Sequence, residues 1–503
     1  MEFYKKNRNA IFIPLLFLLS FAIRLYYLPA TPIYGDEAAY AEIINEFSRN
    51  PSLIPHYMGH IVSWKPTFGF AVYSLIINVL WTLNPQIPLE VAYRVPSVVF
   101  GVLSTLALYF LVRKLYGEEL AFFSSILFTT NCISVAISEG LLLDSLVLFL
   151  LISGIIFYID GQRDKKNFYY AGFTGALLFL TKSIIALMLP VLAISYYVRD
   201  RKIGRDVKRG TAFLLSLSAV PLTMFLYALL FFLHAPLGKG GDITATYVYD
   251  IFFRVYMQPK FEPSLLLNTI EFLKLTVPWC ILFFSGILLT KLSDREDRFI
   301  FLWLLLTLAF VGAGQFYSWY YLQVLPPFSV ICAKPLLHVK NKRSFLPILL
   351  LLLLLSLPHF ANPSFMDSYI SSSPLNIEKM ETGLFLRNRY SVQSITEKGI
   401  PEIAFYKFHG ESQPNYSRFQ ITVLDPFAIG SYTAYLTVSE IVLGKAQKLN
   451  LTQPDEVWLL MNNSRYVLMD SEVYRIYSEF PLQNYSVAFN SSQGSYVVLE
   501  RLK

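Results

Sequence analysis

Long apolar runs are the feature of this sequence that most restricts its fold. The runs at 11–27, 211–233 and 348–355 consist mainly of aliphatic and aromatic residues. Such segments are stable in the core of a bilayer, where about 20 apolar residues make one crossing. Only 15% of the residues are charged, against about 25% in soluble domains. The sequence therefore excludes a soluble enzyme, a disordered chain and a fibrous chain, and it predicts a polytopic α-helical membrane protein.

Basic residues alternate along the chain in a way that predicts orientation. Six loops carry 21 Lys and Arg, whereas the loops between them carry six. The basic loops are 1–9, 113–118, 160–167, 199–210, 291–298 and 334–343. Because cytoplasmic loops are enriched in Lys and Arg, we expect these loops and the amino terminus to be cytoplasmic. The net charge of +7 is then explained by the orientation of the chain in the membrane. No nucleic-acid partner is expected, because binding nucleic acid would need a basic patch on a soluble face.

Residues 1–360 predict about eleven transmembrane helices and an external loop, 30–90, that contains juxtamembrane helices. The spans are expected near 10–29, 92–112, 119–137, 142–159, 168–181, 183–198, 211–235, 275–290, 299–313, 319–333 and 345–360. The apolar segment 68–83 is left out of this set, because it is short and lies between Pro66 and Pro85. Counting it as a span would also reverse the charge bias of every later loop. We therefore predict an external or re-entrant helix there.

An odd number of spans places residues 361–503 outside the cytoplasm. Five N-x-[ST] sequons, and none in residues 1–360, agree with that location: Asn415, Asn450, Asn462, Asn484 and Asn490. Alternating patterns predict strands at 466–469 and 496–499, and 377–389 and 431–443 are expected to be helical. This part is thus predicted to be an extracytoplasmic α/β domain. The sequons suit a cell membrane, such as an archaeal surface, and an endoplasmic reticulum equally.

Residues able to do chemistry gather on the predicted outer face. Asp36 and Glu37 follow the first span, and Asp144 stands where a later helix begins. Adjacent carboxylates at a helix start serve as an N-cap as readily as a site, but an acidic residue that faces the bundle interior is by default functional. Arg254 is the best external candidate for binding phosphate, with snorkelling to lipid headgroups as its alternative. Arg24, near the outer end of the first span, is interpreted as a snorkelling anchor in preference to a cation that lines the site.

These motifs, taken in order, resemble a known family. The order is Gly-Asp-Glu-x-x-Tyr-Ala-Glu from Gly35, Pro-His-x-x-Gly from Pro55, Lys65-Pro66, Arg94-Val95-Pro96-Ser97 and Asp144, with Thr181-Lys182-Ser183, Pro278-Trp279 and Tyr321-Leu-Gln-Val-Leu-Pro-Pro327 further on. It is similar to the GT-C glycosyltransferases, in particular the dolichyl-phosphate-mannose–protein mannosyltransferases and the aminoarabinose lipid A transferase. The resemblance covers about residues 10–340.

The resemblance implies a GT-C membrane domain at 1–360 that transfers a sugar from a polyprenyl-phosphate donor to a hydroxyl acceptor at the outer membrane face. Asp36 matches the catalytic base of an inverting transfer, while Glu37 and Asp144 match residues that shape the site. Lys65 and Arg254 match the phosphate-binding positions. Lys182, Tyr57 and Tyr321 are further candidates for binding the lipid phosphate or its sugar. The acceptor is a protein, a lipid or a lipid-linked glycan.

The sequence departs from the aminoarabinose branch at two positions. Trp64 stands where that branch has Glu before Lys-Pro, and Ile251 stands where it has His. No metal ligands or other cofactor are therefore implied, although a divalent metal stays open. His56 and His60 have i, i+4 spacing, but Gly59 between them favours a loop over a helix. The three cysteines, all in apolar runs, exclude a disulfide framework.

Two other readings stay open. The first is an oligosaccharyltransferase of the same broad fold, which would use a lipid-pyrophosphate donor and a divalent metal. The second is a lipid flippase or transporter, which predicts ionisable residues at mid-membrane or repeat symmetry between the two halves. Polar residues that gather on one face, and a tail that lacks a Trp-Trp-Asp motif, favour the monophosphate-dependent glycosyltransferase.

Overall fold

The computed structural model describes most of the membrane part and only strands beyond it. The described residues are 8–26, 28, 33, 36–57, 60–62, 65–197, 206–234, 265–313, 318–337, 347, 403–408, 421–422, 450–451, 466–470, 485–492, 494 and 496–502. The helices are α2 (Arg8–Leu25), α3 (Asp36–Arg49), α4 (Phe68–Leu83), α5 (Leu89–Tyr116), α6 (Glu118–Thr129), α7 (Cys132–Glu139), α8 (Asp144–Asp160), α9 (Lys166–Lys182), α10 (Met188–Tyr197), α12 (Val207–His234), α15 (Leu265–Leu275), α16 (Trp279–Leu288), α17 (Arg295–Ala313) and α18 (Leu325–Leu337), with the 3-10 helices η1 (Ser183–Leu187) and η2 (Ser318–Gln323).

Several described helices are long and apolar enough to cross a membrane. By length and composition these are Glu90–Tyr116, Lys166–Tyr197 and Val207–Leu233. The pair α6 and α7 passes the same test together, with a bend of 59° between its members. Asn131 caps α7 at this bend by accepting a hydrogen bond from the Ile133 amide over 3.0 Å. The chain is therefore an integral membrane protein, as predicted, and the expected span 119–137 is two helices instead of one.

The apolar segment from Lys166 to Tyr197 is a hairpin. Its two ends meet, because the rings of Phe168 and Tyr197 lie 6.0 Å apart. Tyr197 also donates a hydrogen bond to the Tyr158 carbonyl at the end of α8. The chain turns at Lys182, where α9 stops and η1 begins. The length of this segment alone would suggest one crossing, but its geometry agrees with the two segments and the turn at Lys182 that the sequence predicts.

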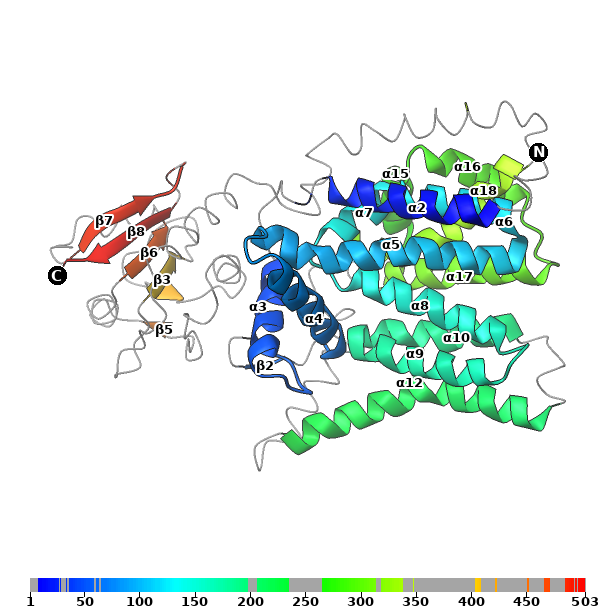
Figure 1. The fold of residues 1–503 in the computed structure, drawn as a ribbon, viewed down its shortest axis with the longest axis horizontal. Helices are drawn as coiled ribbons and strands as arrows, with labels where there is room; N and C mark the ends of the chain where they lie inside the picture. Colours follow the sequence, from blue (N-terminus) through cyan, green and yellow to red (C-terminus); the bar gives the residue numbers. More distant parts are fainter. Residues whose placement is uncertain are drawn as a thin grey trace.

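Two helices lie across one end of the bundle. Figure 1 shows α2, α5, α8, α9 and α12 running alongside one another, with α3 and α4 placed across one end of this group. Helix α4 has the bounds 68–83 of the helix that the sequence excludes from the spans. It packs against α3, α5 and α9. The structure therefore contains this helix at the bundle end, whereas its position outside the bilayer stays a prediction.

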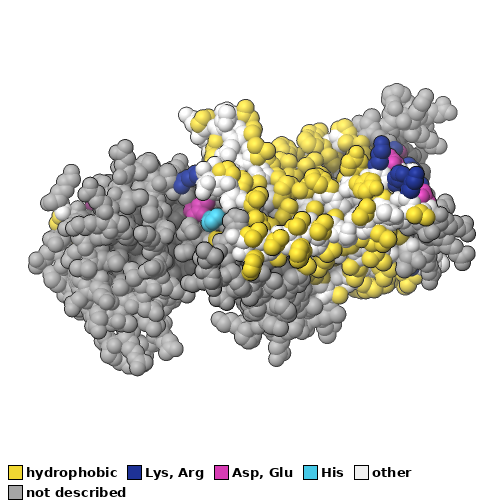
Figure 2. All heavy atoms as spheres, turned by 90° about the horizontal axis from the view of Figure 1, so that it is seen from below, with side chains coloured by type: hydrophobic (Ala, Val, Ile, Leu, Met, Phe, Trp, Pro, Cys, Tyr) yellow, Lys and Arg dark blue, Asp and Glu magenta, His cyan; other side chains and the backbone are white. Residues whose placement is uncertain are grey.

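Charged residues occupy both ends of the bundle, and apolar residues cover its middle. Figure 2 shows a broad hydrophobic surface with Lys, Arg, Asp and Glu gathered at one end and a smaller polar group toward the other. Ion pairs lie at the predicted cytoplasmic loops: Lys114–Asp160 at 2.7 Å, Lys334–Asp297 at 2.7 Å and, within the loop 113–118, Arg113–Glu118 at 3.2 Å. The carboxylate of Asp297 also accepts a hydrogen bond from Tyr116 over 2.9 Å.

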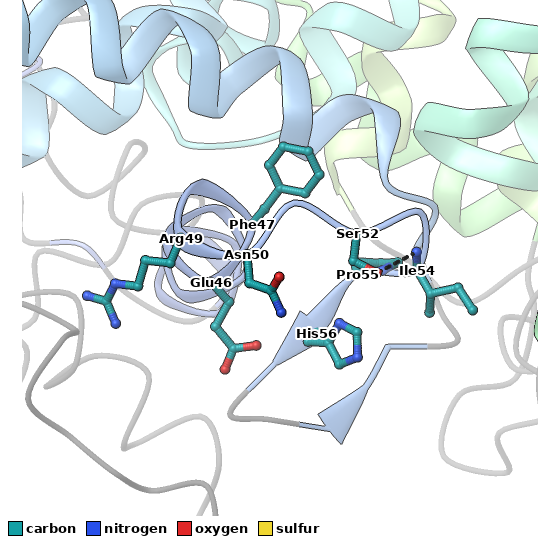
Figure 3. Close-up of a pocket in the computed structure, with 8 residues that line it drawn as sticks. All are labelled: Glu46, Phe47, Arg49, Asn50, Ser52, Ile54, Pro55 and His56. Carbon is teal, nitrogen blue, oxygen red and sulfur yellow. Dashed lines mark hydrogen bonds between the residues drawn. The ribbon is translucent and has the colours of Figure 1, made fainter. Parts of the chain in front are cut away.

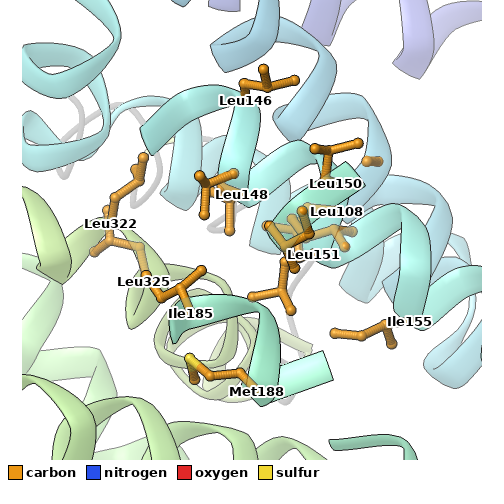
Figure 4. Close-up of a cluster of buried hydrophobic side chains, with 14 of the residues drawn as sticks. Leu108, Leu146, Leu148, Leu150, Leu151, Ile155, Ile185, Met188, Leu322 and Leu325 are labelled. Carbon is orange, nitrogen blue, oxygen red and sulfur yellow. The ribbon is translucent and has the colours of Figure 1, made fainter. Parts of the chain in front are cut away.

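A large apolar core runs through the described helices, with a smaller cluster at Leu28, Val98 and Val102. Figure 4 shows leucines of α5 and α8 facing Ile185 of η1, Leu322 of η2 and Leu325 of α18. Leu148, Ile185 and Leu322 are each at most 1% exposed. In a bilayer the alternative to burial is contact with lipid, so these side chains stabilise the fold mainly through close van der Waals packing. The core therefore holds η2 against α8, and η1 against α9 and α10.

Beyond residue 360 the structure describes a mixed six-stranded sheet. Its strands are β3 (Ile403–Phe408), β4 (Ile421–Thr422), β5 (Asn450–Leu451), β6 (Tyr466–Asp470), β7 (Tyr485–Asn490) and β8 (Tyr496–Arg501), in the order β5-β4-β3-β6-β8-β7. Strand β6 pairs parallel with β3 and antiparallel with β8. The strands predicted at 466–469 and 496–499 are thus confirmed. The predicted helices at 377–389 and 431–443 and most of the span 345–360 lie outside the described residues.

Candidate functional site

A buried ion pair fixes the start of α3. Glu37 accepts hydrogen bonds from Arg94 Nε over 2.9 Å and from Arg94 Nη2 over 2.8 Å, so the pair is bidentate. The third guanidinium nitrogen donates to the Leu28 carbonyl over 3.0 Å. Glu37 is 6% exposed and Arg94 is 1% exposed. The pair therefore joins α5, the start of α3 and the chain after α2 into one rigid unit.

The same unit holds the loop that leads to Asp144. The Leu141 amide donates to Glu37 Oε1 over 2.7 Å. The Leu142 carbonyl accepts hydrogen bonds from the Tyr73 hydroxyl over 2.8 Å and from the Ser97 hydroxyl over 3.0 Å. Every one of these groups is buried. Glu37 and Asp144 are therefore linked through a loop whose backbone is fixed by side chains of α3, α4 and α5.

Asp144 is the first residue of α8 and forms a second buried ion pair. Its Oδ1 accepts a hydrogen bond from Lys182 Nζ over 2.6 Å, and the two side chains are 2% and 6% exposed. The Lys182 ammonium also lies over the ring of Tyr320, 4.4 Å from its centroid. The structure thus brings together Asp144 and Lys182, two residues that the sequence predicts separately. Tyr320 has no role in the sequence analysis, because only its neighbour Tyr321 belongs to the recognised motif.

Arg24 is buried, so the interpretation as a snorkelling anchor is wrong. Its side chain is 0% exposed and donates to the hydroxyls of Ser20, Thr129 and Ser134, each over 2.7 Å. A Cβ at Gly101 would lie 2.8 Å from Arg24 Nε, so α5 needs a glycine at this approach. The guanidinium stays in the bundle because hydroxyls of three helices replace its water.

Glu139 is a buried acid to which the sequence analysis assigns no role. It is 1% exposed, and among the residues that the structure describes neither of its carboxylate oxygens has a hydrogen-bond partner. Arg24 and Arg94 lie near enough to attract its charge. In the sequence, Glu139 could have been found from its position at the end of an apolar run, five residues before Asp144. Glu139 therefore adds a third acidic residue to the end of the bundle where Glu37 and Asp144 lie.

The remaining predicted site residues are placed only in part. Asp36 is the first residue of α3, next to Glu37, but its side chain lies outside what the structure describes. Lys65 is half-buried just before α4. Tyr321 is fully buried in η2, with its ring 5.2 Å from that of Phe272. The side chain of Tyr57 and the whole of Arg254 lie outside the described residues.

The two histidines near residue 58 do not share a helix. His56 and His60 belong to the short antiparallel strands β1 (His56–Tyr57) and β2 (His60–Ile61), which confirms the predicted loop. Within the described residues, no three His, Cys, Asp or Glu side chains converge on a point where a metal would bind. Asp144 already has a cation, the Lys182 ammonium, on Oδ1.

A pocket of about 340 Å³ opens at the far end of α3. Figure 3 shows Glu46, Arg49, Asn50, Ser52 and His56 among the residues that line it. Helix α3 has 14 residues, so this end lies about 20 Å along the helix from Asp36. The pocket is therefore too distant to hold the atoms that react at Asp36 or Glu37.

Glu42, on the buried side of α3, is expected to make stability depend on pH. Burial, and to a lesser extent the nearby charge of Glu46, raises the pKa of Glu42 from 4.5 to about 8. The folded protein therefore keeps a proton that the unfolded chain releases, so the free energy of unfolding falls by about 1.4 kcal/mol per pH unit between these two values. Relative to Glu42→Gln, the melting temperature of the wild type should decrease from pH 5 to pH 8. A difference that stays constant across that range would contradict this prediction.

Comparison with known proteins agrees with the motifs. The family model "Dolichyl-phosphate-mannose-protein mannosyltransferase" matches residues 72–233. Curated relatives include undecaprenyl phosphate-alpha-4-amino-4-deoxy-L-arabinose arabinosyl transferases. The one from Aeromonas hydrophila is 28% identical over 41% of this chain and 38% of its own length. The one from Aeromonas salmonicida is 26% identical over 64% of this chain and 58% of its own length. The matches thus span less than two thirds of these relatives.

Solved structures show the same architecture along nearly the whole chain. ArnT from Cupriavidus metallidurans bound to undecaprenyl phosphate superposes with a TM-score of 0.69 and 13% identity, over 98% of each chain. The archaeal oligosaccharyltransferase AglB from Archaeoglobus fulgidus, in complex with an inhibitory peptide and a dolichol-phosphate, superposes with a TM-score of 0.56 and 13% identity, over 98% of this chain and 74% of AglB. The chain therefore has the GT-C glycosyltransferase fold, and its resemblance to the protein mannosyltransferases and aminoarabinose transferases is confirmed.

Proposed function

We propose that this protein transfers a sugar, a hexose or a pentose, from a polyprenyl-phosphate donor to a hydroxyl of a protein, a lipid or a lipid-linked glycan. The transfer takes place at the extracytoplasmic membrane face and serves glycosylation of proteins or of the cell envelope. Two buried ion pairs carry the proposal: Glu37–Arg94 and Asp144–Lys182. Both lie at one end of the bundle, beside the first residue of α3. The relatives named as arabinosyl transferases and the structures bound to polyprenyl phosphates support the donor class.

The proposed reaction inverts the configuration of the sugar. Asp36 accepts the proton of the acceptor hydroxyl while the bond to the anomeric carbon forms. The bond from that carbon to the lipid phosphate breaks on the opposite side, and the polyprenyl phosphate leaves with the bonding electrons. Cations already in place stabilise this leaving group, a role that we assign to Lys65 and Arg254. Tyr57 and Tyr321 are proposed to donate hydroxyl hydrogen bonds.

The two ion pairs give the carboxylates different tasks. Glu37 is fully occupied by Arg94 and the Leu141 amide, so it holds the start of α3 and does not act as a base. Asp144 has Oδ1 engaged with Lys182, and we assign to this pair the orientation of the donor sugar or the acceptor. Neither assignment requires a metal ion.

The experiment that tests the function measures sugar lost from the donor lipid. Purified protein is incubated with radiolabelled polyprenyl-phosphate hexoses, polyprenyl-phosphate aminoarabinose and polyprenyl-pyrophosphate glycans, with a membrane extract as acceptor. We expect turnover of a monophosphate donor and none of the pyrophosphate donors. Turnover of the pyrophosphate donors alone would favour the oligosaccharyltransferase reading, which the similarity to AglB keeps in view. Binding without turnover of any donor would favour a lipid transporter.

A further inference from the structure

A buried polar side chain ends η2, the 3-10 helix whose Tyr320 ring lies by the Lys182 ammonium. Gln323, the last residue of η2, is 1% exposed. Within the described part of the chain, neither its amide nitrogen nor its amide oxygen makes a hydrogen bond. Water solvates such an amide in the unfolded chain, so burying it unbonded is unfavourable. A ligand with hydroxyls would remove this cost by hydrogen bonding to the Gln323 amide.

The geometry of η2 directs Gln323 to the side on which Lys182 lies. A 3-10 helix has three residues per turn, so side chains at i and i+3 lie on one face, with a rise of about 2 Å per residue. Gln323 follows Tyr320 by three residues, and the Tyr320 ring lies 4.4 Å from the Lys182 ammonium. Gln323 therefore lies about 6 Å along η2 from Tyr320, on the same face.

The packing of η2 fixes this face. Leu322 is buried in the core that Figure 4 shows, and the Tyr321 ring packs against Phe272. The helix also contacts α7 and α8, the two helices that carry Glu139 and Asp144 at their facing ends. Tyr320 is half-buried, so this cluster reaches the surface beside its ring. A ligand that contacts Tyr320 and Lys182 comes within one helical turn of Gln323.

We propose that Gln323 determines sugar specificity, by hydrogen bonding of its amide to a hydroxyl of the sugar that the donor lipid carries. The inference rests on the proposed function, because it assigns the sugar of that donor to the Asp144–Lys182 end of the bundle. Ser183, the residue after Lys182, has a buried hydroxyl that also makes no hydrogen bond among the described residues. Within the described residues, the Ser183 hydroxyl is thus a second buried polar group to which a ligand with several hydroxyls would hydrogen-bond.

The test compares lipids with and without the sugar. The probes are decaprenyl phosphate and decaprenyl phosphate carrying mannose, glucose or galactose, and the dissociation constant of each is measured for purified wild type and Gln323→Leu. Leucine keeps most of the volume and removes both amide atoms. We expect the sugar lipid that the wild type binds best to bind Gln323→Leu about tenfold more weakly or worse, since a buried partner is lost. Affinity for decaprenyl phosphate should not change.

The matched control is the same substitution at a second glutamine, Gln162. Gln162 lies two residues beyond Asp160, just past the opposite end of α8, and Gln162→Leu should change no affinity. If Gln323→Leu weakens the bare and the sugar lipids equally, or weakens neither, Gln323 does not read the sugar. If the wild type binds bare and sugar lipids with equal affinity, the inference fails while the donor class stands. If the wild type binds none of the four lipids, the proposed function itself fails.

Discussion

Replacement of Arg94 by methionine is expected to lower the free energy of unfolding by about 3–5 kcal/mol, because it leaves the buried Glu37 carboxylate without its counter-charge. The loss includes two charge-assisted hydrogen bonds to Glu37 and one to the Leu28 carbonyl. Thermal and denaturant unfolding of the purified protein in detergent measure the effect. Since Glu37 follows Asp36 directly, the variant should also lose glycosyl transfer.

Arg113→Met is the matched control for this prediction. Arg113 pairs with Glu118 at the other end of α5, where the two side chains are 39% and 30% exposed. Exposed pairs contribute no more than about 1 kcal/mol. The double variant Glu37→Gln/Arg94→Met should regain part of the lost stability, because no buried charge is then left unpaired. If Arg94→Met and Arg113→Met lowered the free energy of unfolding equally, the stabilising role assigned to the buried Glu37–Arg94 pair would be contradicted.

Replacement of Lys182 by methionine is expected to lower kcat/KM for sugar transfer at least about 100-fold, comparable to the loss of a preorganised electrostatic contact in other enzymes. The substitution removes the cation 2.6 Å from Asp144 Oδ1 and leaves that carboxylate buried and unpaired. Asp144→Asn should have a loss of similar size. Because the two residues act as one unit, the double variant should be little worse than either single variant.

Stability separates a functional ion pair from a purely structural one. The double variant Lys182→Met/Asp144→Asn contains no buried charge at this position, so its melting temperature should rise above that of Lys182→Met. Its activity should stay low. Recovery of stability together with activity would show that the pair only supports the fold, and the role assigned to it in the proposed function would then be withdrawn.

Hydropathy predicts where most helices lie, because the cost of unpaired backbone groups in lipid leaves few alternatives to a helix. The turn at Lys182 was also predictable, because a single cation there separates two apolar segments. The bend at Asn131 was missed because the stretch 119–137 is mainly apolar and contains neither Gly nor Pro. Its signal was a residue type that favours helix starts, in the middle of the predicted span.

Partners distant in the sequence could not be predicted in the same way. Arg24 at the end of a span is typical of a snorkelling anchor, but Thr129 and Ser134, more than 100 residues away, keep it inside. Arg94 was recognised as part of a motif, yet its bidentate contact with Glu37 depends on how α3 docks on α5. Tyr320 and Gln323 became candidates only once η2 was seen to pack against α7 and α8.

The catalytic assignment of Asp36 is the central claim, and sugar transfer by Asp36→Asn tests it most directly. The assay compares wild type, Asp36→Asn and the control Asp164→Asn, in which the substituted side chain lies on the loop between α8 and α9 and its Oδ1 accepts from the Lys166 amide. Asparagine keeps that acceptor, so Asp164→Asn should turn over the polyprenyl-phosphate donor at the wild-type rate. Asp36→Asn should bind the donor with unchanged affinity and lose turnover at least about 100-fold. Turnover by Asp36→Asn at the wild-type rate would contradict the assignment.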